Sequence, residues 1–92
     1  MGPNVGIEPL QTEEPGRVRL MPNPARTQVT VEVEDALRSV EVMDAVGHVL
    51  VTKHYKGNVQ SATLNISILP KGVYVVMVLT SKGIAAKRLV VQ

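Results

Sequence analysis

The sequence contains no cysteine, no phenylalanine and no tryptophan, and Tyr55 and Tyr74 are its only aromatic residues. Without cysteine, disulfide bonds and thiolate metal ligands are excluded. Surfaces that bind single-stranded nucleic acid usually combine basic groups with several aromatic rings, so we expect no nucleic-acid partner. No apolar run approaches the length of about 18 residues that a membrane-spanning helix needs. We therefore expect no membrane insertion.

Residue patterns that are typical of catalytic or cofactor sites are also missing. The chain has no phosphate-binding loop and no HExxH zinc motif. His48 and His54 lie on one expected strand at a separation of about 20 Å, too far apart to hold the same metal ion. A chain of 92 residues forms a single domain, for which a deep active-site cleft is not expected. We therefore expect no enzyme activity, no cofactor and no metal site.

Charge is distributed unevenly along the chain. Residues 1–44 hold four basic and eight acidic side chains, whereas residues 45–92 hold six basic side chains and no acidic one. A basic half can attract an anionic surface or an acidic partner. Alternatively, a sheet that pairs the acidic half with the basic half largely cancels the two fields. The sequence leaves both interpretations open.

The first residues differ in composition from the rest of the chain. Residues 1–16 contain three prolines, three glycines and three glutamates, and their apolar residues follow no period. This composition predicts a flexible linker or a segment derived from expression. The folded domain is then expected to cover residues 17–92.

From residue 17 onward the chain shows the alternation of β-strands. Val29, Val31 and Val33 alternate with polar residues, as in a strand that is buried on one face. Similar runs, separated by glycine, proline and asparagine, predict strands at residues 17–21, 27–34, 39–42, 48–54, 61–67, 73–79 and 84–91. The chain has no helical period. The sequence therefore predicts an all-β fold, an immunoglobulin-like antiparallel β-sandwich of about seven short strands.

Two glycines have expected roles in the connections between strands. Residues 44–47 begin with Asp44 and end with Gly47, a pattern that suits a type I turn with a glycine bulge and hence a hairpin. Gly72 is expected to adopt a positive φ ahead of the following strand.

The strand predicted at residues 73–79 is apolar on both faces. If Tyr74, Val76 and Val78 face the core, an exposed apolar row results on the other side, formed by Val73, Val75, Met77 and Leu79. Monomers usually avoid such a row unless it is an interface. We expect an interface here, with a homodimer as one form of it, unless the linker or a loop covers the row.

Several short motifs follow one another in a fixed order. They are Met21-Pro22-Asn23-Pro24-Ala25, Val29-Thr30-Val31, Val40-Glu41-Val42-Met43-Asp44, Gly47-His48-Val49-Leu50, Leu64-Asn65-Ile66-Ser67, Leu69-Pro70-Lys71-Gly72-Val73-Tyr74 and Lys87-Arg88-Leu89-Val90-Val91. In order and spacing they resemble the C-terminal sorting domain of cargo proteins of the type IX (Por) secretion system of Bacteroidetes. The resemblance covers residues 17–92. Where that family usually has tyrosine before the PNP motif, this chain has Met21.

The resemblance implies an exported domain without catalytic activity of its own. Such a domain follows a passenger protein and directs it from the periplasm across the outer membrane to the cell surface or the extracellular space. An outer-membrane translocon recognises the domain, and a sortase-like peptidase normally removes it. Cleavage is expected within residues 1–16, ahead of the folded part. This chain would then be the tail of a longer precursor.

The resemblance also indicates which residues form the sorting signal. They are Pro22, Asn23, Pro24, Gly47, Gly72, Tyr74, Lys87, Leu89, Val90 and Val91. The PNP motif is expected to form a stiff bend whose asparagine bonds nearby backbone. The last strand is expected at a sheet edge, where a receptor could pair with it. The PNP motif could instead be only the first turn of the sandwich, and core packing alone could explain Gly72 and Tyr74.

Two other functions stay open at this stage. One is an uncleaved β-sandwich module that binds a periplasmic or surface partner. The other is a surface adhesion domain, although two tyrosines offer little for stacking on sugar rings.

Overall fold

The computed structural model describes residues 16–92, which form seven strands joined by short connections. They are β1 (Val18–Met21), β2 (Gln28–Val33), β3 (Leu37–Met43), β4 (Val49–His54), β5 (Ser61–Asn65), β6 (Gly72–Thr80) and β7 (Gly83–Val91). Residues 16–92 form no helix that could span a membrane. Residues 1–15, on which most of the predicted linker falls, lie outside the described residues.

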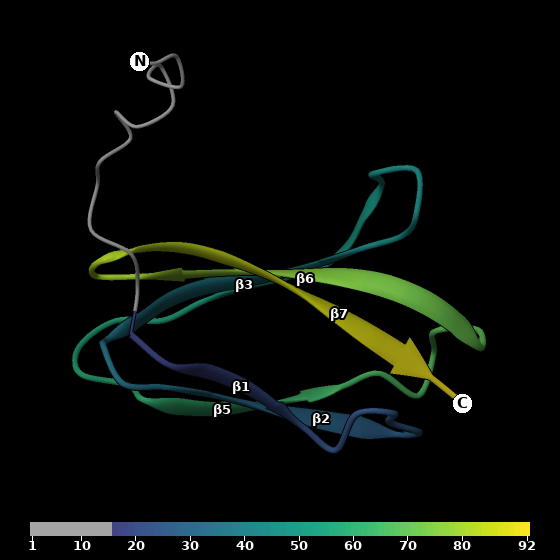
Figure 1. Cartoon of the computed structure of the whole chain (residues 1–92), viewed down its shortest axis with the longest axis horizontal. Helices are drawn as coiled ribbons and strands as arrows, with labels where there is room; N and C mark the ends of the chain where they lie inside the picture. The colour runs from purple at the N-terminus through teal and green to yellow at the C-terminus, as the bar shows by residue number, and fades with distance from the viewer. Residues whose placement is uncertain (1–15) are drawn as a thin grey trace, which may run out of the picture.

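The strands form two antiparallel sheets that face each other. One sheet has the order β1-β2-β5 and the other has the order β4-β3-β6-β7. The chain changes sheet between β2 and β3, between β4 and β5 and again between β5 and β6, so the two layers are interleaved in sequence (Figure 1). The predicted immunoglobulin-like β-sandwich of seven strands is confirmed.

The core consists of the inward-facing side chains of both sheets. Val29, Val31 and Val33 of β2 are buried, as their alternation predicts. The fully or nearly fully buried hydrophobic residues are Val18, Ala25, Val29, Val31, Val33, Leu37, Val40, Val42, Leu64, Ile66, Leu69, Tyr74, Val76, Val78, Leu89 and Val91. Valine dominates this set because β-branched side chains suit a pleated, half-buried surface.

The predicted hairpin at Asp44 is also confirmed. The Gly47 N–H donates to the Asp44 carbonyl at 3.1 Å, and the φ of Gly47 is 95°, in the left-handed region that favours glycine. The Asp44 Oδ1 accepts the N–H groups of Val46 and His48 at 3.0 and 2.9 Å. The bond from the His48 N–H is the largest influence that lowers the pKa of the Asp44 carboxyl.

Tyr74 is the single aromatic side chain of the buried core. Its hydroxyl donates to the Pro70 carbonyl, four residues earlier. This geometry is that of a tyrosine corner, in which a buried ring reaches the rim of a β-sandwich and bonds the backbone a few residues upstream. Gly72, between the two residues, has a positive φ of 156°, as predicted.

Candidate functional site

The PNP motif and the last strand meet at one place in the structure. The Asn23 Nδ2 donates to the Arg88 carbonyl at 2.8 Å, and the Val90 N–H donates to the Asn23 Oδ1 at 3.0 Å. The peptide bonds before Pro22 and Pro24 are both cis. The asparagine side chain therefore bonds backbone, as predicted, but that backbone belongs to β7, 65 residues away, rather than to its own turn.

Ala25 continues this contact along the strand. Its N–H donates to the Val90 carbonyl at 2.8 Å, and its carbonyl accepts the Gln92 N–H at 2.8 Å. Ala25 forms a parallel bridge with Val91, and its side chain is buried. Asn23 and Ala25 together thus occupy the place of an eighth strand beside residues 88–92. Nothing in the sequence pattern indicated this role for Ala25.

The side chains of β7 alternate between the core and the outer face. Leu89 and Val91 are buried in the core. Arg88 and Val90 have the opposite orientation and lie on the outer face of the four-stranded sheet. Lys87 shares the inward orientation of Leu89, as its spacing predicts, but remains exposed.

The predicted edge position of the last strand is confirmed, with a qualification. β7 is the outermost strand of its sheet. Beside Arg88, Val90 and Gln92, however, the outer backbone groups already bond Asn23 and Ala25. A receptor strand could pair with this half of β7 only after displacing the PNP segment. The sequence could not show this because the covering segment lies far away along the chain.

Of the remaining predicted signal residues, two adjoin β7 and one does not. Gly72 pairs with Val91, and Tyr74 pairs with Leu89, so the start of β6 supports the end of β7 directly. Gly47 is instead at the tip of the β3–β4 hairpin, which projects away from the rest of the sandwich in Figure 1. The structure therefore does not bring Gly47 to the site formed by Asn23 and β7.

The predicted apolar row is present on the outer face of β6. Val73 and Leu79 are 51% and 38% exposed, whereas Val75 and Met77 are half-buried between β3 and β7. Ile84 of β7, which the sequence analysis did not single out, pairs with Leu79 and is 59% exposed. A hollow of about 210 Å³ lies between these strands, lined by Ser39, Glu41, Met77, Leu79 and Ile84.

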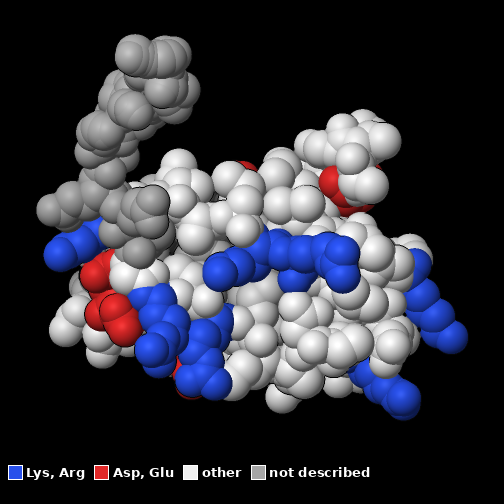
Figure 2. Space-filling view, in the orientation of Figure 1, with Lys and Arg blue, Asp and Glu red and all other residues white. Residues whose placement is uncertain are grey.

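Charged groups gather on the face that Figure 2 presents. Lys and Arg form a band over β7 and a second group over β1, and the acidic groups in view lie toward the ends of the molecule (Figure 2). No cluster of three or more metal-ligating side chains is found within residues 16–92.

Comparison with known proteins gives a structural and a family result. One solved structure with a similar fold is CopC from Methylosinus trichosporium OB3b, with a TM-score of 0.49 and 21% identity over 83% of this chain and 94% of that chain. A search of curated proteins finds no significant match. The family model of the secretion system C-terminal sorting domain matches residues 19–92. This match spans β1 to β7, and with it both the PNP segment and the last strand that contact each other. The chain therefore belongs to the secretion system C-terminal sorting domain family, whose domains are signals for export.

Proposed function

We propose that the outer-membrane translocon of the type IX system recognises the site at which the PNP segment bonds β7. The observation that carries the proposal is the pair of hydrogen bonds between Asn23 and the backbone of Arg88 and Val90. These bonds make the two most distant motifs of the family one surface, which a receptor can contact as a unit. Pro22, Pro24, Lys87 and the outer face of β7 belong to that surface.

The same proposal includes passage through the periplasm and cleavage ahead of the domain. The first strand begins at Val18, and from there on the backbone belongs to the sandwich or to its short connections. Proteolytic sites concentrate in backbone that sheets and tight turns do not hold. A sortase-like peptidase that cuts within residues 1–16 would release the passenger and leave the sandwich whole.

A homodimer through the apolar row is the third part of the proposal. Glu41 and Arg88 lie on the outer face, on either side of Val75 and Met77. In a two-fold arrangement each copy could place its Glu41 against the partner's Arg88 while the apolar rows bury each other. The exposed Val73 and Leu79 would then be covered.

The experiment that tests the proposed function is a passenger fusion. Residues 1–92 are placed behind a fluorescent protein with an export signal, in a strain with the secretion system and in a strain without it. We expect surface fluorescence in the first strain alone. Equal surface display in both strains would contradict the function.

Two variants locate the recognised surface. Asn23→Ala removes the bonds to β7, and we expect it to reduce display while the domain remains folded by circular dichroism. The matched control is Asn65→Ala, because the Asn65 side chain also accepts two bonds, from the Ser67 N–H and hydroxyl, away from β7. Equal display of the two variants would remove Asn23 from the signal.

A further inference from the structure

The first half of the β7 edge differs from the half that the PNP segment covers. Backbone groups of Arg88, Val90 and Gln92 point away from β6, since they bond Asn23 and Ala25. Along an antiparallel strand, the N–H and C=O groups of successive residues point alternately toward and away from the neighbouring strand. The β6–β7 register has no shift, so the backbone groups of Ile84 and Ala86 also point away from β6. Within residues 16–92 these groups have no hydrogen-bond partner on that side.

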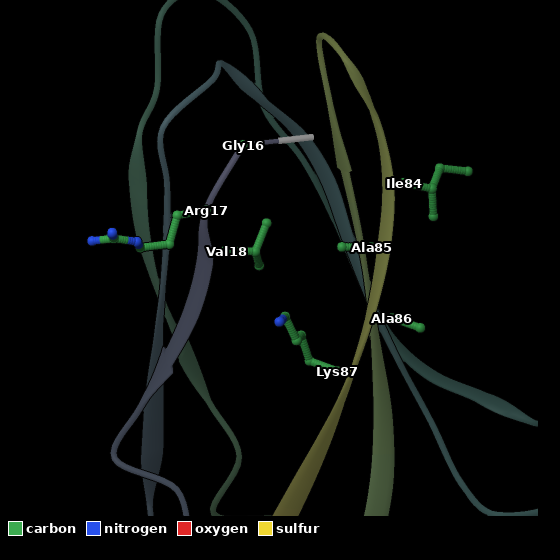
Figure 3. A pocket seen from close by; sticks show the side chains of 7 residues that line it. All are labelled: Gly16, Arg17, Val18, Ile84, Ala85, Ala86 and Lys87. Carbon is green, nitrogen blue, oxygen red and sulfur yellow. The ribbon is translucent and has the colours of Figure 1, made fainter. Parts of the chain in front are cut away.

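A groove runs beside this open half of the strand. Its volume is about 460 Å³, and it is lined by Gly16, Arg17, Val18, Ile84, Ala85, Ala86 and Lys87. In Figure 3, Val18 of β1 and Lys87 of β7 point into the space between the two strands. Ile84 and Ala86 point away from it, and so does Arg17 (Figure 3). Among the residues that the structure describes, the groove therefore has one cationic side chain directed into it and no carboxylate in its lining.

Lys87 determines which strand could join this edge. Inward-pointing charges on edge strands oppose pairing with another chain, because an apolar strand would bury the charge unpaired. Within residues 16–92 no carboxylate lies within ion-pair distance of Lys87. A strand that brings its own carboxylate to the lysine removes this penalty, whereas apolar and basic strands do not.

We infer that the open edge at Ile84 and Ala86 binds an extended acidic segment of a partner protein as an additional strand. The segment would be about five residues long, because paired strands rise by the same distance of about 3.3 Å per residue and the segment would lie beside residues 84–88 of β7. Backbone bonds to Ile84 and Ala86 give affinity, and a carboxylate opposite Lys87 gives selectivity. The inference concerns residues next to, and not within, the contact between Asn23 and β7.

The test uses the full chain and a synthetic peptide in which valine alternates with glutamate. Nuclear magnetic resonance titration should show saturable shifts of the amide signals of residues 84–88. A peptide with lysine in place of glutamate should bind at least about tenfold more weakly, because it sets like charges opposite each other. Equal affinity for both peptides, or shifts confined to the other sheet edge at β4, would overturn the inference.

Two substitutions separate the charge from the backbone pairing. Lys87→Glu should weaken binding of the acidic peptide by about tenfold or more, whereas Lys53→Glu on the opposite edge strand β4 should change it less than about twofold. Ala86→Pro removes an N–H that points away from β6, so the β6–β7 ladder should persist while peptide binding is lost.

The outcomes of these variants are decisive in either direction. Retained binding by a folded Ala86→Pro chain would overturn the proposed pairing. Equal losses of acidic-peptide binding in Lys87→Glu and Lys53→Glu would overturn it as well. If the acidic peptide does not bind but the chain self-associates, and Ala86→Pro abolishes that association, the occupant is a second copy and not an acidic partner.

Discussion

Asn23 bonds the β7 backbone on either side of Leu89, since its amide nitrogen donates to the Arg88 carbonyl and its amide oxygen accepts the Val90 N–H. One side chain thereby replaces the donor and the acceptor that a paired strand would supply. It does so at the boundary between the covered and the open half of the β7 edge. The bonds lie at an exposed position, so their net contribution to stability is moderate.

This relationship predicts the effect of Asn23→Ala on the isolated chain. The free energy of unfolding should fall by about 1–2 kcal/mol, because two bonds to backbone groups are lost where water can replace them. Urea denaturation measures the change, and amide hydrogen exchange at Val90 should accelerate. Asn65→Ala is the control, with an unchanged exchange rate at Val90. A loss of stability without faster exchange at Val90 would contradict the role assigned to the Asn23 bonds.

Neighbouring residues of β7 should respond very differently to truncation. Leu89 is fully buried, so Leu89→Ala should cost about 2–5 kcal/mol through lost burial and a residual cavity. Arg88→Ala changes an exposed side chain and should stay within about 0.5 kcal/mol. Denaturant midpoints of the two variants provide the comparison. Similar costs at the two positions would contradict the orientation of the strand.

The apolar row on β6 predicts that substitutions on it weaken self-association of the chain without unfolding the domain. Changing Val75 and Met77 together to Thr keeps strand-forming residues on the outer face and should leave the domain folded. Sedimentation should show weaker self-association than in the unchanged chain. The matched change Val76→Thr alters a fully buried neighbour and should destabilise the fold. If the double variant unfolds, the row belongs to the core.

The lowered pKa of Asp44 predicts how the β3–β4 hairpin responds to acid. A carboxyl whose pKa is lower in the folded chain than in the unfolded chain stabilises the fold above its unfolded pKa, and this contribution is lost as the pH falls through the folded pKa. Protection of the Val46 and His48 amides from exchange, measured relative to the intrinsic exchange rate at each pH, should therefore fall below the ordinary aspartate pKa of about 3.9. Asp44→Asn should remove most of this pH dependence. An unchanged acid response in that variant would exclude Asp44 as its origin.

The domain boundary predicts where proteases cut first. From Val18 onward the backbone belongs to strands or to their connections, and such backbone resists cleavage. Limited proteolysis followed by mass spectrometry should give first cuts before about residue 20. The exposed turns at Gly57 and Gly83 provide an internal comparison. First cuts at either turn would contradict a boundary near residue 17.

The repeating features of the fold could be predicted from the sequence, because they depend on near neighbours. The alternation of Val29, Val31 and Val33 fixes which face of β2 is buried. The spacing from Asp44 to Gly47 fixes a turn. Both sets of features depend on residues only two or three positions apart, and the structure confirms both.

The contact between Asn23 and β7 could not be predicted in the same way. It joins residues 65 positions apart, and the alternation of neither segment contains information about the other. Lys87 is an intermediate case. Its inward orientation follows from the spacing to Leu89, but its exposure depends on the groove between β7 and the start of β1, which is a property of the assembled sandwich.

The parallel arrangement of Ala25 and Val91 has a mechanical consequence. Suppose a force pulls the N-terminal side of Ala25 one way and the C-terminal side of Val91 the other way. The bonds of Ala25 to Val90 and Gln92 lie across that direction and are loaded together, in shear, instead of opening one after another. We therefore expect a load applied between Ala25 and the C-terminal end of β7 to be resisted by both bonds at once, so that this short contact breaks in one step rather than by peeling.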